Sequence, residues 1–215
     1  MDPAVDLVTI YLQLNGYFVQ TELPVLGRVS RDPLRYEQIT DVDMLAVRFP
    51  GRGQIDMPEG IEHWVGIVPL DESLGVDKHE IDLIIGEVKE GPSRLNKNLR
   101  NPGVLRAVLL HAGGVLPVDA DEVIDKLIET GDVRVEGQRG DPVRIRTIVF
   151  GRTRPEPRLG RPYHVVPHEQ TLNFVWNTLH THRELFRVIQ AKNHSLALLR
   201  MIERSIRAEK QSERR

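Results

Sequence analysis

The chain has 215 residues, of which 40% are hydrophobic and 28% charged, and this composition is typical of one globular domain with a substantial core. Its formal net charge of −2 excludes a basic field over the whole surface, so any affinity for nucleic acid must come from a local patch. The sequence contains no cysteine, which excludes disulfides, thiol nucleophiles and metal centres with cysteine ligands.

The N-terminal half is predicted to begin with a helix and to continue with strands. Pro3 lies near the start of the helix, and Gly16 is placed to end it as a C-cap. In chain order we then expect a strand at 17–25, an Arg-rich loop at 25–38, a strand at 40–49, an insertion at 50–79 that includes a short strand at 61–70, and a strand at 81–89.

The C-terminal half is predicted to mix helices and strands and to end in two helices. In chain order we expect a helix at about 102–113, a helix at 119–131 with an acidic first turn, a strand at 142–151, a basic loop at 152–162, a strand at 163–167, and helices at 169–190 and 196–211. Helices placed between groups of strands indicate an α/β domain of three layers.

The strand predicted at 81–89, IDLIIGEVK, carries its acid–base pair at the carboxyl end. Side chains alternate between the two faces of a strand, so Ile85, Glu87 and Lys89 share one face. Apolar residues lie on both faces, which is typical of a central strand covered on both sides. Ligands bind at the carboxyl ends of strands in open α/β sheets, so this end is a candidate site. A plain salt bridge or a solvated strand end is the alternative, because Glu-x-Lys is common by chance.

The strand predicted at 40–49 offers a partner for this end. An antiparallel pairing can set Asp43 directly opposite Glu87. A slip of one residue would break every apolar pair of this register at once, so we predict the register itself. It matches three apolar pairs along the strands: Leu45 with Ile85, Val47 with Leu83, and Phe49 with Ile81.

Two carboxylates that lie side by side repel each other unless a cation lies between them. Asp43 and Glu87 therefore point to a hard divalent cation, Mg²⁺ or Mn²⁺, which prefers oxygen ligands and binds substrate phosphate. Lys89, on the same face, is placed to stabilise charge on a phosphate or to orient a water. Together these residues predict metal-assisted attack of water on a phosphodiester.

These residues resemble the PD-(D/E)xK nuclease superfamily. Asp43, followed by an apolar strand, is similar to its metal-binding Asp, and Glu87-Val88-Lys89 is similar to its (D/E)-x-K signature. The stretch AVDLVTIYLQLNGYFV resembles its first helix and strand, and the likeness covers roughly residues 3–175. The resemblance implies a restriction-endonuclease-like α/β fold, a mixed central sheet flanked by helices in the order helix, three strands, helix, strand.

The resemblance also implies an activity, that of a metal-dependent deoxyribonuclease whose product carries a 5′-phosphate. Asp43, Glu87 and the Val88 carbonyl would bind the metal, and Lys89 would assist the attacking water.

Three basic residues follow this motif. In the fold that the resemblance implies, Arg94, Lys97 and Arg100 would border the cleft and bind DNA phosphates. A solvated loop is the alternative for these three residues.

The sequence departs from the family pattern in three places. Val42 stands where many members have Pro, and Asp6 is the nearest match to the acid that some members carry in the first helix. The insertion at 50–79 lengthens the gap between the two motif strands. His180 and His182 are predicted to be ordinary helix residues, because positions i and i+2 face different sides of a helix.

We expect a nuclease domain at 1–191 and a C-terminal helical tail at 192–215. The absence of an apolar run long enough for a bilayer, and of a basic N-terminal region, favours a cytoplasmic protein without a membrane partner. The alternative function is a DNA-binding or protein-interaction subunit that is idle or activated by a partner. A homodimer or a larger defence or repair complex fits either function.

Overall fold

The computed structural model describes residues 2–28, 35–50, 70–113, 120–152, 162–183 and 194–212, with side chains through residue 206. Its elements are α1 (Pro3–Leu14), β1 (Phe18–Arg28), β2 (Tyr36–Arg48), η1 (Glu72–Leu74), β3 (Ile81–Lys89), η2 (Lys97–Arg100), α2 (Pro102–His111), α3 (Ala120–Thr130), β4 (Asp132–Glu136), β5 (Pro142–Gly151), β6 (His164–Pro167), α4 (His168–Thr181) and α6 (His194–Ser212), where η denotes a 3₁₀-helix. Most of the strand predicted at 61–70, and the end of the helix predicted at 169–190, lie outside the described residues.

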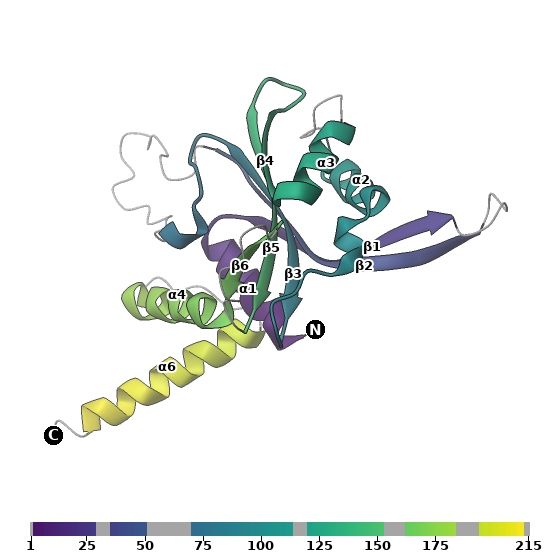
Figure 1. Ribbon diagram of the computed structural model, residues 1–215. Coiled ribbons are helices and arrows are strands. Elements are labelled where there is room, and N and C mark those ends of the chain that lie inside the picture. The colour runs from purple at the N-terminus through teal and green to yellow at the C-terminus, as the bar shows by residue number, and fades with distance from the viewer. Residues whose placement is uncertain are drawn as a thin grey trace.

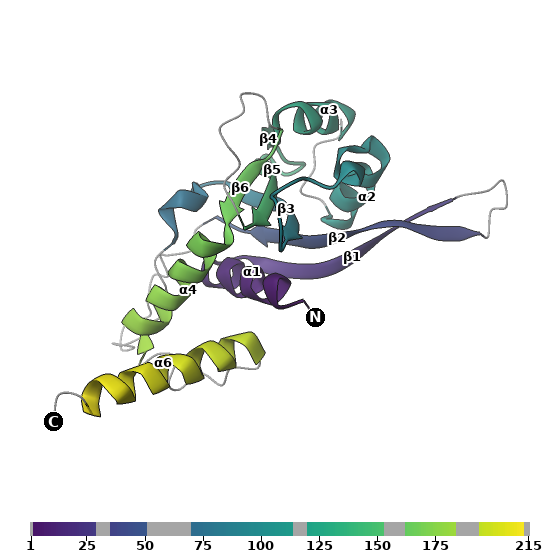
Figure 2. The same cartoon turned by 60° about the horizontal axis from the view of Figure 1, so that its bottom comes forward.

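A mixed sheet forms the middle layer, with the strand order β1-β2-β3-β5-β4. The first three strands are antiparallel neighbours, whereas β3 and β5 are parallel. The short strands β4 and β6 both pair with the far edge of β5, β4 along its first half and β6 along its end. Helices α2 and α3 cover one face, and α1 and α4 cover the other (Figures 1 and 2). The predicted α/β class with a mixed sheet flanked by helices is confirmed.

The strand β3 is buried on both faces, as its sequence predicts. Leu83 and Ile85 belong to a core cluster that also contains residues of η2, α2 and α3. Ile84 and Val88 belong to a second cluster, formed with α1, α4 and η1. The side chains of β3 therefore connect the two helical layers, and only the carboxyl end of the strand carries an exposed charge.

A buried ion cluster lies toward the other end of β3. The Asp82 carboxylate is fully buried and accepts hydrogen bonds from Tyr17 Oη at 2.5 Å and from Arg146 Nε at 3.0 Å. Arg146 also donates to the Leu74 carbonyl at 2.7 Å, so the cluster connects β3 and β5 with η1 and the start of β1. The side chain of Arg48, opposite Asp82 in β2, is buried as well. Burial and the Asp82 charge raise the pKa of the Tyr17 phenol, so Tyr17 stays a donor.

Three features differ from the sequence predictions. No element was predicted for the segment that forms β4, although Val133 and Val135 alternate as a half-buried strand requires. The loop predicted at 25–38 is shorter, because β1 continues to Arg28 and β2 already begins at Tyr36, which gives a long hairpin. Phe49 was expected in the core opposite Ile81, but it lies beyond the end of β2, is 52% exposed and packs edge-on against Phe18.

The C-terminal helix α6 packs on α1 and α4 through its first half, where Leu196 and Leu199 are partly buried against the second core cluster. Its remaining turns extend away from the body (Figure 2). Among the described residues, none of the helices has both the length and the apolar character that a bilayer span requires.

The buried ion cluster leads to a stability prediction. Replacing Asp82 with Asn removes the ion-pair partner of the buried Arg146 guanidinium, so we expect the free energy of unfolding to fall by about 3–5 kcal/mol. Chemical denaturation measures this change. Asp125→Asn, an exposed position on α3, is the matched control and is expected to change stability by less than about 0.5 kcal/mol. Equal effects of the two substitutions would contradict a stabilising role for the cluster.

Candidate functional site

The predicted register between the two motif strands is confirmed. Strands β2 and β3 pair from Met44 opposite Gly86 to Arg48 opposite Asp82, so Asp43 and Glu87 occupy the next position at the end of the ladder. Here Asp43 Oδ2 accepts a hydrogen bond from the Val88 backbone N–H at 2.7 Å. The Asp43 carboxylate is thus held against the peptide group that follows Glu87.

Glu87 is a buried carboxylate with one unsatisfied oxygen. Its side chain is about 2% exposed, and Oε1 forms an ion pair with Lys89 Nζ. Oε2 is buried and has no hydrogen-bond partner. Burial raises the pKa of Glu87, the bond from Lys89 opposes this shift, and the charge of Asp43 adds to it. Buried polar atoms are nearly always satisfied, so this orphaned oxygen makes Glu87 a candidate ligand for a cation.

Asp43 lies in a less enclosed but still unfavourable setting. Burial raises its pKa against the hydrogen bond from Val88, and the negative charges of Asp41 and Asp2 raise it further. A third acid, Asp41, lies two residues before Asp43 on the same strand. Its negative charge contributes to the raised pKa of both Asp43 and Glu87. A cation at this point would relieve the repulsion between Asp43 and Glu87.

The donor set fits a hard cation that keeps part of its water shell. All the available groups are oxygens, which suit Mg²⁺ or Mn²⁺. In the part of the chain that the structure describes, no group of three or more His, Asp or Glu side chains could hold a metal ion. Asp43 and Glu87 therefore supply two carboxylates, the number with which Mg²⁺ is commonly held when water and substrate phosphate complete its shell.

Lys89 is placed at the border between the site and solvent. Its side chain is 38% exposed while its ammonium contacts Glu87, so it pairs with Glu87 and no ion pair with Asp43 is seen. The Lys89 carbonyl lies 3.0 Å from Nε2 of His168, the first residue of α4. Since a carbonyl only accepts, Nε2 carries the proton, and the buried Nδ1 has no partner.

His168 was missed by the sequence interpretation. A signal was available, because the strand predicted at 163–167 leads directly into this residue. Strand β6 runs parallel to β5, and β5 runs parallel to β3. Parallel strands end at the same edge of a sheet, so the residue after β6 is brought to the edge where Lys89 lies.

The three basic residues predicted to bind DNA follow β3 in the segment that contains η2. Arg94, Lys97 and Arg100 are all exposed, and the last two bound η2. Leu99 of η2 packs in the core cluster that contains Ile85, the neighbour of Glu87 on its face of β3. The 3₁₀-helix η2 therefore lies on the side of the sheet toward which Glu87 points, and the contacts of the three basic side chains with DNA stay a prediction.

Asp6, the predicted match to an acid in the first helix, contacts the C-terminal helix. Its Oδ2 accepts a hydrogen bond from Ser195 Oγ of α6 at 2.8 Å, and its Oδ1 is buried without a partner. Asp6 is not among the acids whose charge raises the pKa of Asp43. The structure therefore brings Asp43 and Glu87 together and ties Asp6 to α6.

The backbone is strained directly beside Asp43. Glu22 of β1 lies between Thr21, which pairs with Met44, and Leu23, which pairs with Val42, so it faces Asp43 across the ladder. Its φ of +53° is left-handed, which costs a residue other than Gly about 1–3 kcal/mol. The β1–β2 pair twists at this point. Met44 packs in the second core cluster, whereas Val42, two residues away, packs in the first.

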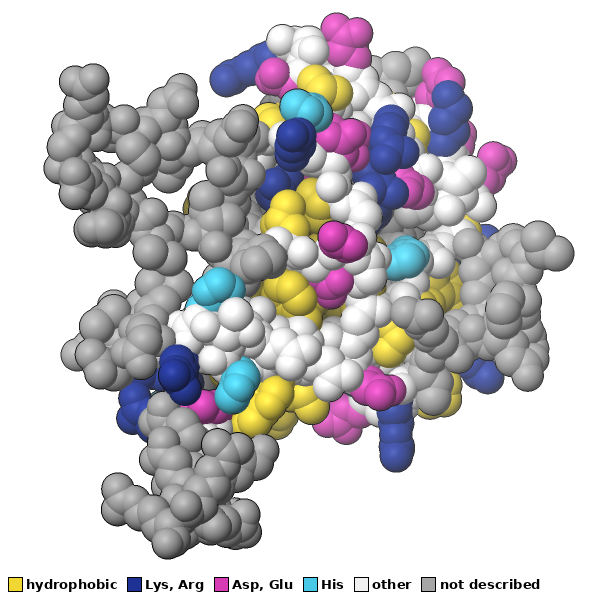
Figure 3. All heavy atoms as spheres, turned by 90° about the vertical axis from the view of Figure 1, so that its left-hand side faces the viewer, with side chains coloured by type: hydrophobic (Ala, Val, Ile, Leu, Met, Phe, Trp, Pro, Cys, Tyr) yellow, Lys and Arg dark blue, Asp and Glu magenta, His cyan; other side chains and the backbone are white. Residues whose placement is uncertain are grey.

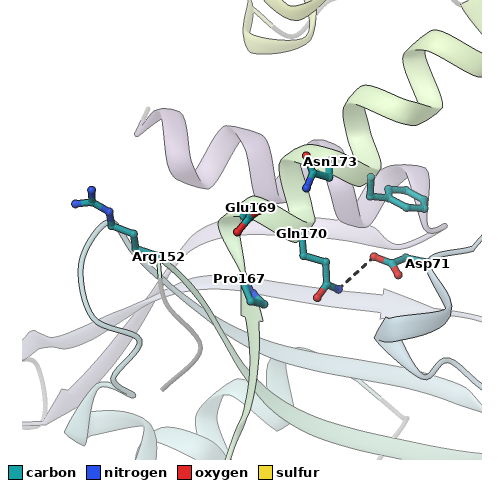
Figure 4. Close-up of a pocket in the computed structure, with 7 residues that line it drawn as sticks. Asp71, Arg152, Pro167, Glu169, Gln170 and Asn173 are labelled. Atoms are coloured by element: carbon teal, nitrogen blue, oxygen red, sulfur yellow. Dashed lines mark hydrogen bonds between the residues drawn. The ribbon is translucent and has the colours of Figure 1, made fainter. Parts of the chain in front are cut away.

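A pocket of about 690 Å³ opens beside the same sheet edge, on the side of α4 (Figure 4). Arg152, which follows the Gly151 that pairs with Lys89, stands at one end of it, and Gln170 donates a hydrogen bond to Asp71 at the other. Its lining residues come from three segments: Asp71, Arg152, Pro167, Glu169, Gln170, Asn173 and Phe174. This pocket lies on the opposite face of the sheet from the carboxylates.

No protein-family model, curated protein or solved structure matches the chain. The chemistry of the site is therefore the basis on which a function can be assigned.

The raised pKa of Asp43 gives a prediction that needs no substrate. A carboxyl whose pKa is higher in the folded state destabilises the fold when ionised, and this cost vanishes below its ordinary value of 3.8. Asp43→Asn keeps an acceptor for the Val88 N–H, so we expect a higher melting temperature at pH 7.5 without metal, and no difference from the unchanged protein at pH 3.5.

The same melting curves test the metal. Mn²⁺ at ten times its dissociation constant is expected to stabilise the unchanged protein by about 1.4 kcal/mol, and Asp43→Asn is expected to shrink this gain. Asp125→Asn is the control and should leave both curves in place. A destabilised Asp43→Asn protein with an undiminished Mn²⁺ shift would show that Asp43 is not a ligand.

Proposed function

We propose that the protein is a metal-dependent deoxyribonuclease. The observation that carries this proposal is the buried, unpartnered Oε2 of Glu87 beside the second carboxylate of Asp43. The element order supports it in part: α1, β1 to β3 and α2 follow the order that the resemblance to PD-(D/E)xK nucleases implies, and β5 comes after an added α3 and β4.

Each site residue has a defined part in this proposal. Asp43 and Glu87, together with the Val88 carbonyl, would hold Mg²⁺ or Mn²⁺, which supplies Lewis-acid stabilisation of the phosphate. Lys89 would set its ammonium beside the reacting phosphate, neutralise the charge that develops on its oxygens and orient the attacking water. The water oxygen would form a bond to phosphorus and release a proton to solvent. The bond to the 3′ oxygen would break, that oxygen would take up a proton from solvent, and the product would keep a 5′-phosphate.

A second function is favoured by the small number of carboxylates. Two acids with a lysine already paired to one of them also suit a DNA-binding or protein-interaction subunit whose site is idle until a partner completes it. This protein would bind DNA but would not cleave it alone. Cleavage by the purified chain distinguishes the two functions.

Plasmid nicking with Mg²⁺ or Mn²⁺ tests the proposal. We expect the purified protein to nick supercoiled DNA, and Asp43→Ala, Glu87→Ala and Lys89→Ala each to reduce the rate at least about hundredfold, because each removes a group that acts on the transition state. Melting curves check that each variant is folded.

Two further variants serve as matched controls for nicking. Glu90→Ala removes an exposed acid next to the site, and Asp6→Ala removes the acid bound to α6, so both should nick at close to the unchanged rate. Undiminished nicking by Glu87→Ala would assign the activity to another site or to a contaminant.

DNA affinity tests the basic residues after β3. If Arg94, Lys97 and Arg100 contact phosphates, replacing all three with Ala lowers the slope of log affinity against log salt by up to about 2.7, since each phosphate contact contributes about 0.9. Arg139→Ala combined with Arg204→Ala, both exposed and on other elements, is the control. An unchanged slope in the triple variant would return these residues to an ordinary solvated loop.

A further inference from the structure

The β1–β2 hairpin extends as a free ribbon beyond the sheet. Among the described strands, β3 pairs with β2 only from Met44 to Arg48, so the part of β2 from Tyr36 to Asp43 pairs with β1 alone. These eight residues span about 25 Å. Figure 2 shows the ribbon extending past the helices on both sides of the sheet. We call residues 26–28 and 36–39 the arm.

The large apolar side chains of the arm are exposed to solvent and belong to neither core cluster. At the base of the hairpin, Leu23, Val25 and Val42 are buried in the first core cluster. In the arm, Leu26 is 59% exposed, Tyr36 55% and Ile39 44%. Large apolar side chains gathered on a two-stranded projection indicate a binding surface.

One face of the arm carries side chains of the types that contact base edges in DNA. Arg28 pairs with Tyr36 and Leu26 with Gln38, and positions two apart share a face, so these four side chains lie together. Arg28 Nη2 donates to Tyr36 Oη at 3.2 Å, and its guanidinium lies 5.6 Å from the ring centre, which holds it on this face. Arginine recognises guanine, glutamine recognises adenine, and aliphatic groups contact the thymine methyl in the major groove.

The dimensions and position of the arm favour duplex DNA as the ligand. The major groove of B-DNA admits a two-stranded β-ribbon. The arm is continuous with the strand that carries Asp43, and Gln38 precedes Asp43 by five residues, or about 17 Å. This distance equals about five base pairs of duplex. On the face that looks away from the arm, the basic and acidic side chains of the described residues are interspersed (Figure 3).

We propose that the arm inserts the face formed by Leu26, Arg28, Tyr36 and Gln38 into the major groove of duplex DNA. It thereby holds the duplex next to the sheet that carries Asp43 and gives the protein a preference for double strands and for certain base sequences. This inference rests on the proposed function, because it names the substrate class of the same site.

Binding measurements without turnover test the arm. The full chain is mixed with a pool of 30-base-pair duplexes of random sequence, or with the matching single strands, and Ca²⁺ replaces Mg²⁺. We expect Arg28→Ala combined with Gln38→Ala to weaken duplex binding at least about tenfold, to leave single-strand binding unchanged and to remove sequence enrichment from the bound pool. Tyr36→Ala is expected to act in the same direction.

The controls use comparable residues away from the arm. Phe18 is an exposed aromatic residue at the other end of β1, and Arg139 is exposed in the turn between β4 and β5. Phe18→Ala and Arg139→Ala should bind duplex like the unchanged protein. All the substituted positions are exposed, and melting curves confirm that the variants fold.

Each remaining outcome overturns the arm inference. These outcomes are no measurable duplex binding by the unchanged protein, no loss in the arm variants, or equal losses on single strands or in the controls. A dimer in solution that Tyr36→Ala dissociates would assign the arm to a second copy of the chain instead. Cleavage separates the two proposals: nicking with unaffected arm variants overturns the arm alone, whereas duplex binding through the arm without nicking overturns the nuclease alone.

Discussion

The register between β2 and β3 is the constraint on which the candidate site depends. Asp43 and Glu87 are far apart in the chain, and only this pairing brings them to the same end of the sheet. A shift by one residue would turn the apolar side chains of β3 toward the wrong core cluster. The packing energy of two hydrophobic layers therefore holds two like charges together, which neither acid would favour by itself.

Strand β3 contains two buried carboxylates whose hydrogen-bonding environments differ. Near its start, Asp82 receives hydrogen bonds from Tyr17 and Arg146 and stabilises the fold. At its end, Glu87 keeps one oxygen without a partner, and its pKa is raised. The first arrangement is complete within the chain, whereas the second would gain free energy from the cation that we propose. Rigid support next to an unsatisfied group is what a preorganised site requires.

Local pattern predicted the central strand, its register and the two acids, because alternation and apolar matching are properties of neighbouring residues. Features that arise from distant contacts were not predicted. In the arm, Leu26 and Tyr36 are apolar but exposed, so the alternation of apolar and polar residues there does not indicate which face is buried. The strained Glu22 gives no sequence signal, since glycine usually occupies a left-handed position. The contact of His168 with Lys89 depends on a strand order that the sequence does not state.

The parallel pairing of β3 with β5 has a consequence during synthesis on the ribosome. Arg146 of β5 follows its partner Asp82 by 64 positions, so β3 emerges well before the strand that covers its second edge. Until then a strand that is apolar on both faces presents an open edge to other chains. The nascent chain is therefore prone to aggregate after Asp43 and Glu87 have been synthesised and before β5 is complete. Chaperone binding would protect the chain during this interval.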